Sequence, residues 1–178
     1  MVEVHDDFKS LITTQSYISK TPISGVVLKE VPKFNDESGS FSEMVRFNND
    51  GTLESFPDFK VEQASWSVLH PGGIKAFHLH YKQDDVWFVP GSESLLIGLH
   101  DIRKDSPTYG KTMRFMMGCG KSQLLRIPAG VLHGCANLST SSCHLIYFVN
   151  QKFDALNPDE HRVPYNITDE SFWEKIPG

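Results

Sequence analysis

The feature that most constrains the fold is a series of short apolar segments separated by glycine- and proline-containing turns. The segments include "IKAFHLHY", "DVWFV", "SLLIGLHDI", "QLLRI" and "CHLIYFV", and the turns include "HPGG", "PGSE" and "PAG". Short strands at roughly regular spacing with such turns are typical of antiparallel barrels and double-sheet jelly rolls. No long amphipathic helix lies between the strands, so a parallel sheet built from βαβ units is excluded. The sequence therefore predicts an all-β fold of antiparallel strands.

Helical signals are confined to the two ends of the chain. Residues 6–14 (DDFKSLITT) and 168–175 (TDESFWEK) can each form one short helix. The 178 residues contain no repeat, low-complexity tract or linker. We therefore expect a single domain, residues 1–178, with an N-terminal arm at about 1–30, a core at about 31–165 and a short C-terminal tail.

Charge and cysteine content exclude several classes of protein. A net charge of −5 is not that of a general nucleic-acid binder, which usually presents a basic surface. The N-terminus has no basic leader followed by an apolar run, so we expect no signal peptide and no membrane span. Three cysteines without paired spacing, Cys119, Cys135 and Cys143, argue against a disulfide framework and favour a cytoplasmic protein. Each of the three is expected to be a small buried residue.

The strand "IKAFHLHY" carries two histidines, His78 and His80, two positions apart. Residues i and i+2 of a strand face the same side, so both rings are expected to face together. His133 follows the turn "PAG" further along the chain. Three imidazoles together with Asp85 could bind a divalent iron, manganese, nickel or zinc ion. Histidine also exchanges protons near neutral pH, so a proton-transfer site is equally open.

Two motifs around these histidines resemble those of the cupin superfamily of small jelly-roll barrels. The first runs from Gly72 to Gly91 and contains both histidines, with Asp85 where the superfamily usually has glutamate. The second is "PAGVLHGCAN", which contains His133. The resemblance implies a cupin jelly-roll barrel with few short helices. In metal-binding cupins, residues at these positions hold a divalent metal.

A more extensive resemblance is to the dTDP-4-dehydrorhamnose 3,5-epimerase family. It rests on "DIRKDSPTYGK" followed by "LLRIPAGVLHGCANLS", and on "DESGSFSE", "QASWS", "GGIKAFHLHY" and "HLIYFVNQKF" in the family's order. The resemblance covers residues from about 30 to 165. This family is a cupin branch that epimerises nucleotide-linked 4-keto-6-deoxy sugars without a metal. The resemblance implies the same class of reaction here, with no cofactor.

The reaction defines the roles that the resemblance assigns. A ketone at C4 acidifies the protons on C3 and C5, so a base removes one and an acid returns a proton from the opposite face. His78 matches the family's base and Tyr147 its acid, although sliding the alignment by two residues makes His80 the base. Lys75 stands where the family has an arginine three residues before the base. The residues expected to bind substrate are Lys75, His80, His133, Ser67, Gln63, Glu43 and Trp87.

The chain departs from the family at several positions. Ser38 replaces an arginine that contacts the nucleotide, and Phe153 replaces a second tyrosine. The lysine that follows the base has no clear counterpart. The late aspartate that pairs with the base is not identifiable, so Asp85 is the candidate to orient a histidine instead. These departures favour another nucleotide carrier or epimerisation at a single carbon.

We therefore predict an isomerase acting at C3, C5 or both of a dTDP- or CDP-linked 4-keto-6-deoxyhexose, in deoxysugar or surface-polysaccharide (O-antigen) biosynthesis. One alternative is a metal-dependent cupin oxygenase or isomerase that uses His78, His80, Asp85 and His133. Another is a non-catalytic sugar-binding cupin. The resemblance also implies a homodimer in which segments cross between subunits, and the edge segment 21–31 is a candidate for that arm. No membrane or nucleic-acid partner is expected.

Overall fold

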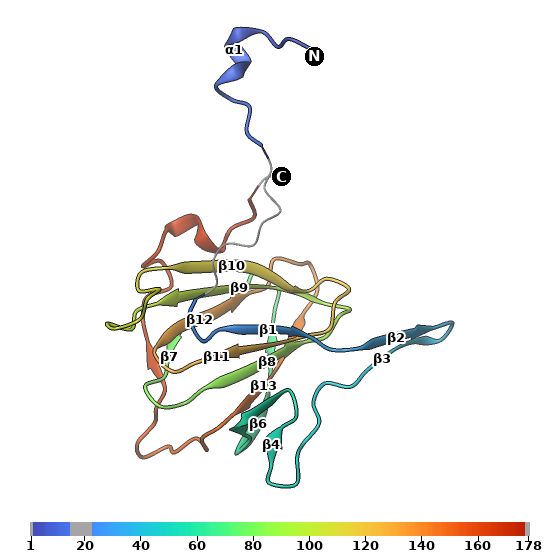
Figure 1. The fold of residues 1–178 in the computed structure, drawn as a ribbon, viewed down its shortest axis with the longest axis vertical. Coiled ribbons are helices and arrows are strands. Elements are labelled where there is room, and N and C mark those ends of the chain that lie inside the picture. Colours follow the sequence, from blue (N-terminus) through green and yellow to red (C-terminus); the bar gives the residue numbers. More distant parts are fainter. Residues whose placement is uncertain (1, 15–22, 177–178) are drawn as a thin grey trace.

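Two five-stranded antiparallel sheets form the body of the molecule (Figure 1). The computed structural model describes residues 2–14 and 23–176. The first sheet contains, in spatial order, β1 (Val27–Glu30), β11 (Gln123–Ile127), β8 (Asp85–Val89), β13 (Cys143–Val149) and β6 (Gln63–Leu69). The second contains β10 (Thr112–Gly118), β9 (Ser94–Asp101), β12 (Val131–Ala136), β7 (Ile74–Leu79) and β14 (His161–Arg162). This antiparallel two-sheet arrangement confirms the predicted all-β class.

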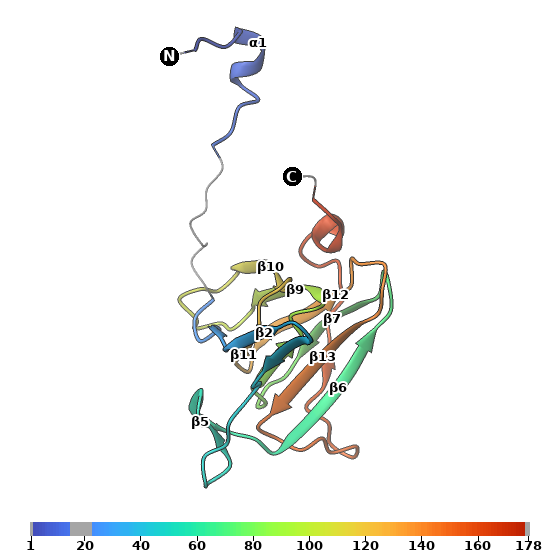
Figure 2. The same cartoon turned by 90° about the vertical axis from the view of Figure 1, so that its right-hand side faces the viewer.

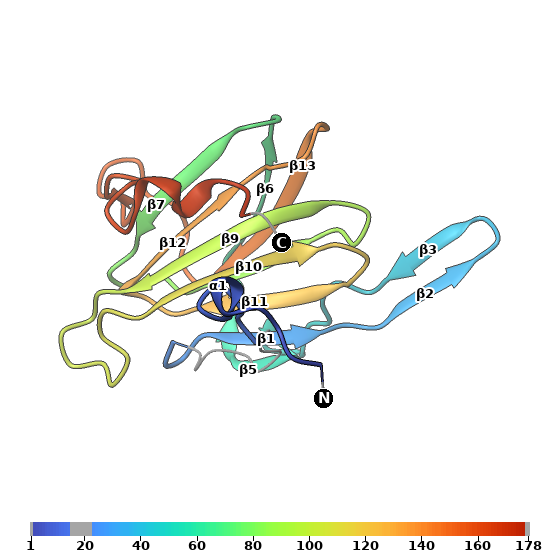
Figure 3. The same ribbon diagram turned by 90° about the horizontal axis from the view of Figure 1, so that it is seen from above.

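Two hairpins are added to the two sheets. One pairs β4 (Thr52–Leu53) with β5 (Phe56–Lys60), and the other pairs β2 (Lys33–Asp36) with β3 (Gly39–Ser42). The β2–β3 hairpin extends away from the sheets in both Figure 1 and Figure 3. The segment 21–31 enters the first sheet of its own chain through β1, which pairs with β11. Residues 21–22 of that segment lie outside the described part.

Alternation along the strands separates the faces of the first sheet. Strands β13 and β6 lie side by side in register, with Tyr147 opposite Ser65 (Figure 2). Odd-numbered residues of β6, β8 and β13 face the second sheet, and even-numbered residues face outward. Val86 and Phe88 on the outer face are covered by the β4–β5 hairpin. Strand β8 is therefore buried on both faces, which explains why "DVWFV" reads as a continuous apolar run.

The second sheet is also covered on its outer face. Phe77 and Leu79 of β7 pack there against Trp173, which is 2% exposed and donates a hydrogen bond from Nε1 to the Tyr165 carbonyl. Trp173 belongs to a single 3₁₀ turn, η1 (Glu170–Trp173), which is shorter than the predicted helix at 168–175. The turn η1 thus covers this part of the outer face with both Trp173 and Phe172, which pack against Phe77.

The N-terminal helix α1 (Asp6–Lys9) is also shorter than the segment 6–14 predicted to form it. None of its residues is buried, and a helix of one turn without a packed face has little to extend it. Within the described residues, no helix combines the length and apolar character needed to cross a bilayer.

The three cysteines are free thiols, and two of them, Cys135 and Cys143, are buried as expected. The prediction is wrong for Cys119, which is exposed. Cys119 lies in the tight turn between β10 and β11, where it and both neighbouring glycines adopt positive φ. A turn of this kind presents its side chains to solvent because the backbone doubles back within a few residues.

Candidate active site

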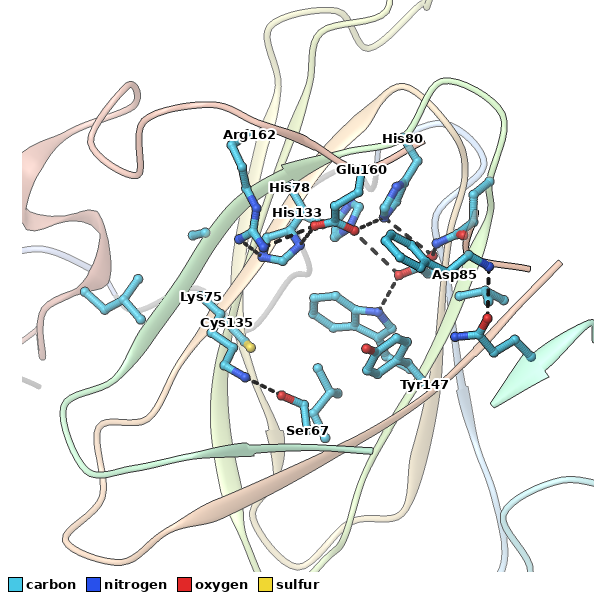
Figure 4. Close-up of a pocket in the computed structure, with 18 residues that line it drawn as sticks. Ser67, Lys75, His78, His80, Asp85, His133, Cys135, Tyr147, Glu160 and Arg162 are labelled. Atoms are coloured by element: carbon cyan, nitrogen blue, oxygen red, sulfur yellow. Dashed lines mark hydrogen bonds and ion pairs between the residues drawn. The ribbon is translucent and has the colours of Figure 1, made fainter. Parts of the chain in front are cut away.

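A cavity of about 530 Å³ lies between the two sheets (Figure 4). Side chains from both sheets and from the segment after β13 form its walls. The lining residues are Gln63, Ser67, Ile74, Lys75, Ala76, His78, His80, Gln83, Asp85, Trp87, His133, Cys135, Leu145, Tyr147, Val149, Phe153, Glu160 and Arg162. Every predicted catalytic or substrate-binding residue except Glu43 therefore faces one cavity.

A β-bulge explains how both Lys75 and His78 reach the cavity although they differ in parity. His78 pairs with His133 across β7 and β12, but the next pair is Lys75 with Cys135, so β7 contains one extra residue. The extra residue reverses the alternation, which turns the Lys75 side chain toward the cavity. At Gly134, an added Cβ would lie 2.4 Å from the Cβ of Ala76, so only glycine allows this close approach of the strands.

The His78 ring lies between a carboxylate and a guanidinium. Its Nδ1 lies 2.8 Å from Oε1 of Glu160, and Nη1 of Arg162 lies 2.6 Å from its Nε2. Because a guanidinium only donates, Nε2 must present its lone pair, and the ring proton then lies on Nδ1 toward Glu160. The contact with His78 lowers the pKa of the Glu160 carboxyl below its usual range, although partial burial opposes this shift. His78 thus has the tautomer of a general base whose reactive nitrogen is Nε2.

Glu160 and Arg162, which both line the cavity and contact His78, were missed by the sequence interpretation. Glu160 lies in "PDEHR", immediately before the two-residue strand β14, which pairs with β7 and sets Arg162 opposite His78. The neighbouring Asp159 carboxylate accepts hydrogen bonds of 2.8–3.0 Å from the backbone N–H groups of residues 81, 82 and 83. These bonds lower the pKa of Asp159 against the opposing effect of its burial. The acidic cluster in "PDEHR" is the only signal in the sequence that pointed to this position.

His80 lies just beyond the end of β7 and has a different environment from His78. It is 4% exposed, and its Nδ1 donates to the backbone carbonyl of Asp159. Its Nε2 lies 3.9 Å from Asp85 and 3.8 Å from Glu160, beyond hydrogen-bonding distance. The partially accessible ring of His78, held by Glu160 and Arg162, therefore fits the role of base better than His80 does.

His133 and Asp85 are buried polar residues of the cavity wall. His133 is 3% exposed and donates from Nδ1 to the Val131 carbonyl at 2.9 Å. Burial lowers the pKa of His133 to about 4, against the opposing effect of Asp85, so its ring is neutral at pH 7. Asp85 accepts hydrogen bonds from Trp87 Nε1 and Gln83 Nε2, and lies 3.8 Å from His133 Nε2. Glu160, rather than Asp85, is thus the carboxylate in contact with His78.

The opposite wall is formed by the first sheet. Tyr147 of β13 points its hydroxyl into the cavity in Figure 4, beside Trp87 and across from His78. The ammonium of Lys75 donates to Ser67 Oγ at 2.5 Å, so a cation of the second sheet meets a hydroxyl of the first. Gln63 Oε1 accepts from the backbone N–H of Phe153 at the cavity mouth.

Glu43 is the one predicted substrate-binding residue that does not line the cavity. Its carboxylate forms a bidentate pair with Arg46, with distances of 2.5 and 2.8 Å, and does not line the cavity. It follows the β2–β3 hairpin, whose turn contains Ser38. Glu43 therefore stays a predicted substrate contact, and it is not among the residues that line the cavity.

Comparisons with known proteins agree with this geometry. The family model for dTDP-4-dehydrorhamnose 3,5-epimerase matches residues 20–171. The spore coat polysaccharide biosynthesis protein SpsL of Bacillus subtilis (strain 168) is 42% identical over 144 residues, which cover 81% of this chain and 91% of SpsL.

Solved structures share the fold at lower sequence identity. A dTDP sugar isomerase from Desulfovibrio desulfuricans G20 superposes with a TM-score of 0.70 at 23% identity, covering 86% of this chain and 91% of that one. ChmJ, a 3'-monoepimerase from Streptomyces bikiniensis in complex with dTDP-quinovose, gives a TM-score of 0.70 at 21% identity, covering 90% and 83%. The predicted cupin jelly roll is thereby confirmed. With the match extending over most of its length, the chain belongs to the dTDP-4-dehydrorhamnose 3,5-epimerase family of isomerases.

Proposed function

We propose that this protein epimerises a nucleotide-linked 4-keto-6-deoxyhexose, with His78 as base and Tyr147 as acid. The substrate class is supported by the family and by relatives that bind dTDP sugars. The similarity to SpsL supports a role in making a surface polysaccharide. The product would then be an epimerised nucleotide-linked 4-keto-6-deoxyhexose, because the reaction leaves the C4 ketone in place.

One observation carries the proposal: His78 and Tyr147 lie on opposite walls of the same cavity. His78 belongs to β7 of the second sheet and Tyr147 to β13 of the first. Inversion of a carbon requires that a proton leave from one face and return to the other. A sugar ring lying between the sheets would present opposite faces to these two side chains. A site with all its titratable groups on one wall could exchange a proton but not invert the carbon efficiently.

The steps follow from the protonation states. Nε2 of His78 removes the proton from the carbon next to the C4 ketone, and the electron pair moves to the C4 oxygen as an enolate. Glu160 stabilises the imidazolium formed, since its carboxylate faces Nδ1. The ammonium of Lys75 is the nearby cation suited to the enolate oxygen. The enolate then collapses and takes a proton from the Tyr147 hydroxyl on the other face.

Substrate binding must also release Nε2. In the free protein Arg162 occupies that nitrogen at 2.6 Å. Arg162 is exposed at the cavity rim, so its guanidinium can move to an anionic group of the substrate. The diphosphate of a nucleotide sugar is such a group. In this way arrival of the correct ligand exposes the base.

The test is proton exchange in deuterated water. The protein is incubated with dTDP-, CDP-, GDP- and UDP-linked 4-keto-6-deoxy sugars, and deuterium at C3 and C5 is followed by NMR. We expect incorporation with at least one carrier, at one or both carbons. His78→Asn should lower the exchange rate by about 10²–10⁴-fold, the usual contribution of a general base. His144→Asn, outside the cavity, is the matched control and should exchange at the wild-type rate.

The variant Tyr147→Phe distinguishes the epimerase hypothesis from the non-catalytic sugar-binding alternative. Loss of the acid should slow formation of the inverted sugar while nucleotide-sugar affinity stays close to wild type, because the ring itself is kept. Absence of exchange with all four carriers, with tight binding of one of them, would instead support the non-catalytic sugar-binding alternative.

Two coarser properties complete the proposal. A homodimer is expected from the resemblance to the family, with Glu43 and the β2–β3 hairpin as the segment available to a partner subunit. Reaction in the cytoplasm is expected because nucleotide sugars are made and used there. The departures from the family at Ser38 and Phe153 support another nucleotide carrier or inversion at a single carbon.

A further inference from the structure

Three buried side chains next to His78 form a cluster of hydrogen-bond acceptors on the cavity wall. Nε2 of His133 lies 3.8 Å from Asp85 Oδ2, and Nε2 of His80 lies 3.9 Å from Asp85 Oδ1. All three residues line the cavity and are at most 4% exposed. The ring centroids of His133 and His78 lie 5.8 Å apart, so this acceptor cluster adjoins the proposed base.

The contacts at Nδ1 make both imidazoles of the cluster acceptors at Nε2. Nδ1 of His80 donates to the carbonyl of Asp159, and Nδ1 of His133 donates to the carbonyl of Val131. A carbonyl only accepts, so in each neutral ring the proton lies on Nδ1 and the lone pair on Nε2. Within the part of the chain that the structure describes, no donor forms a hydrogen bond with either Nε2. Buried acceptors are costly without donors, so the cluster suits a ligand that supplies them.

The other end of the cavity has a different chemical character. Cys135 pairs with Lys75 across β12 and β7, and it packs in the same apolar core as Leu145. Burial raises the pKa of the Cys135 thiol to about 12, so its side chain is a small neutral group at pH 7. Figure 4 shows Cys135 and Lys75 on the side of the view away from His80 and Asp85. A neutral thiol and a leucine side chain suit an apolar part of a ligand.

A 4-keto-6-deoxyhexose has a matching asymmetry about its ketone. Hydroxyls lie on one side, at C3 and C2, and the C6 methyl lies on the other side, attached to C5. With the ketone oxygen at the Lys75 ammonium, hydroxyls placed at the acceptor cluster bring C3 next to His78 and the methyl next to Cys135 and Leu145. The reverse orientation would bury a methyl group against three acceptors and a hydroxyl against the apolar pair.

We propose that the acceptor cluster of His80, Asp85 and His133 binds the C2 and C3 hydroxyls of the sugar, so that His78 acts on C3 alone. The assignment depends on the proposed epimerase function and adds to it the carbon inverted and the hydroxyl required. Asp85 is then a substrate-binding residue rather than one that orients a histidine. C5 lies toward the apolar end of the cavity and keeps its configuration.

The first experiment determines where deuterium enters the sugar. Wild-type protein is incubated in deuterated water with the dTDP-, CDP-, GDP- and UDP-linked 4-keto-6-deoxy sugars, and the C3 and C5 signals are followed separately by NMR. With an accepted carrier, we expect deuterium at C3 and only the level of an enzyme-free blank at C5. Exchange at C5 alone, or at both carbons at comparable rates, would overturn the orientation.

The second experiment compares the accepted nucleotide sugar with its 2-deoxy analogue. The C2 hydroxyl is not on a carbon next to the ketone, so its removal leaves the acidity of the reacting proton nearly unchanged. Loss of a hydrogen bond to a charged acceptor should lower kcat/KM by roughly 10–100-fold. Equal kcat/KM for the two sugars in wild type would overturn the role of the cluster.

A variant tests the part played by Asp85 in this discrimination. Asp85→Asn should reduce the ratio of the two kcat/KM values by at least about threefold, because a hydrogen bond to a neutral amide is weaker than one to a carboxylate. His144→Gln, outside the cavity, should keep the wild-type ratio. An unchanged ratio in folded Asp85→Asn would remove Asp85 from the cluster. The comparison in wild type does not depend on whether Asp85→Asn folds.

Failure of the reaction and failure of the orientation give different results. Absence of exchange with every carrier contradicts the proposed function. Calorimetry with wild-type protein then compares the affinities of the 2-hydroxyl and 2-deoxy sugars on each carrier. Tighter binding of the 2-hydroxyl sugar supports the acceptor cluster as its binding site, and equal affinity overturns it.

Discussion

At the scale of single residues, the orientation of His78 depends on Glu160. The carboxylate contacts Nδ1 at 2.8 Å and fixes the tautomer that leaves Nε2 as the reactive atom. Glu160→Gln keeps the shape of the side chain but removes the charge that stabilises the imidazolium. We expect kcat for solvent exchange to fall by about 10²-fold or more, with little change in KM. Glu54→Gln, on the surface, is the control, and an unchanged kcat in Glu160→Gln would refute the pairing.

Arg162 should act mainly on binding. Its guanidinium is exposed. In the proposed cycle it leaves His78 and contacts an anionic group of the substrate instead. Arg162→Gln is expected to raise KM by roughly 10-fold, the weight of one charge-assisted contact, with a smaller effect on kcat. Arg162→Lys should recover part of the loss because it restores the charge without the planar fork. Steady-state kinetics on the preferred nucleotide sugar measure both constants.

The candidate residues of the site were predictable from short spacings in the sequence, but the partner of the base was not. The two-residue spacing of His78 and His80 and the turn before His133 correctly place all three at one cavity. Glu160 is brought to His78 by a two-residue strand and by the hydrogen bonds that Asp159 accepts from the backbone, and neither carries a periodic signal. A contact made through such a short pairing depends on tertiary structure that local patterns do not encode.

At the scale of elements, the loop between β9 and β10 is built around the buried carboxylate of Asp101. Arg103 donates to it at 2.8 and 2.9 Å, and the hydroxyls of Ser106 and Thr108 donate at 2.5 and 2.7 Å. The bonds from Arg103, and then those from the hydroxyls, hold the pKa of Asp101 well below its usual range although its burial opposes this. The segment "DIRKDSPTYGK" is therefore a folded loop organised by one charge.

Because of the Asp101 carboxylate in this loop, the free energy of unfolding should depend on pH. The pKa of Asp101 is lower in the folded than in the unfolded chain, so the stability that it contributes is complete above about pH 5 and is lost as the pH falls further. Asp101→Asn should cost about 3 kcal/mol at pH 7 by leaving Arg103 without its partner. Between pH 7 and pH 3, wild type should lose about 1 kcal/mol more than the variant. Urea unfolding measures both, and Asp105→Asn, in the same loop, should behave as wild type.

The bulge between β7 and β12 determines which way the Lys75 side chain points. Gly134→Ala would place a Cβ 2.4 Å from that of Ala76 and 2.8 Å from the Lys75 carbonyl. The strands must then separate, so we expect destabilisation of about 1–3 kcal/mol, as for other overpacked sites, together with reduced exchange activity. Thermal melting and the deuterium assay test the two effects. Full activity in a destabilised variant would show that the bulge does not position Lys75.

The strands themselves were largely readable from the sequence, whereas the helices and the bulge were not. Segments such as "SLLIGLHD" and "QLLRI" form strands where apolar runs between turns predict them. The helix predicted at 6–14 contracts to Asp6–Lys9 because it has no packed face. The bulge depends on a contact between Gly134 and Ala76, which are 58 residues apart in the sequence. No residue pattern within either strand predicts such a contact.

At the scale of the whole molecule, the β2–β3 hairpin presents an apolar pair away from the sheets. Phe34 and Phe41 are directly opposite one another and are 62% and 64% exposed. If the hairpin engages a second subunit, as the proposed homodimer requires, sedimentation should give twice the chain's 20.1 kDa mass. Phe34→Ser with Phe41→Ser should then shift the equilibrium toward monomer. Phe8→Ser, exposed in α1, is the matched control, and a wild-type monomer would contradict the proposal.

The distance in sequence between His78 and Arg162, 84 residues, has a consequence for biosynthesis of the enzyme itself. During translation, the strand that carries the base leaves the ribosome long before "PDEHR". A nascent chain can therefore assemble most of both sheets while His78 still lacks its carboxylate and its guanidinium. The contacts around His78 are completed only when β14 pairs with β7. A chain that ends before residue 160 therefore lacks both the carboxylate and the guanidinium that contact His78.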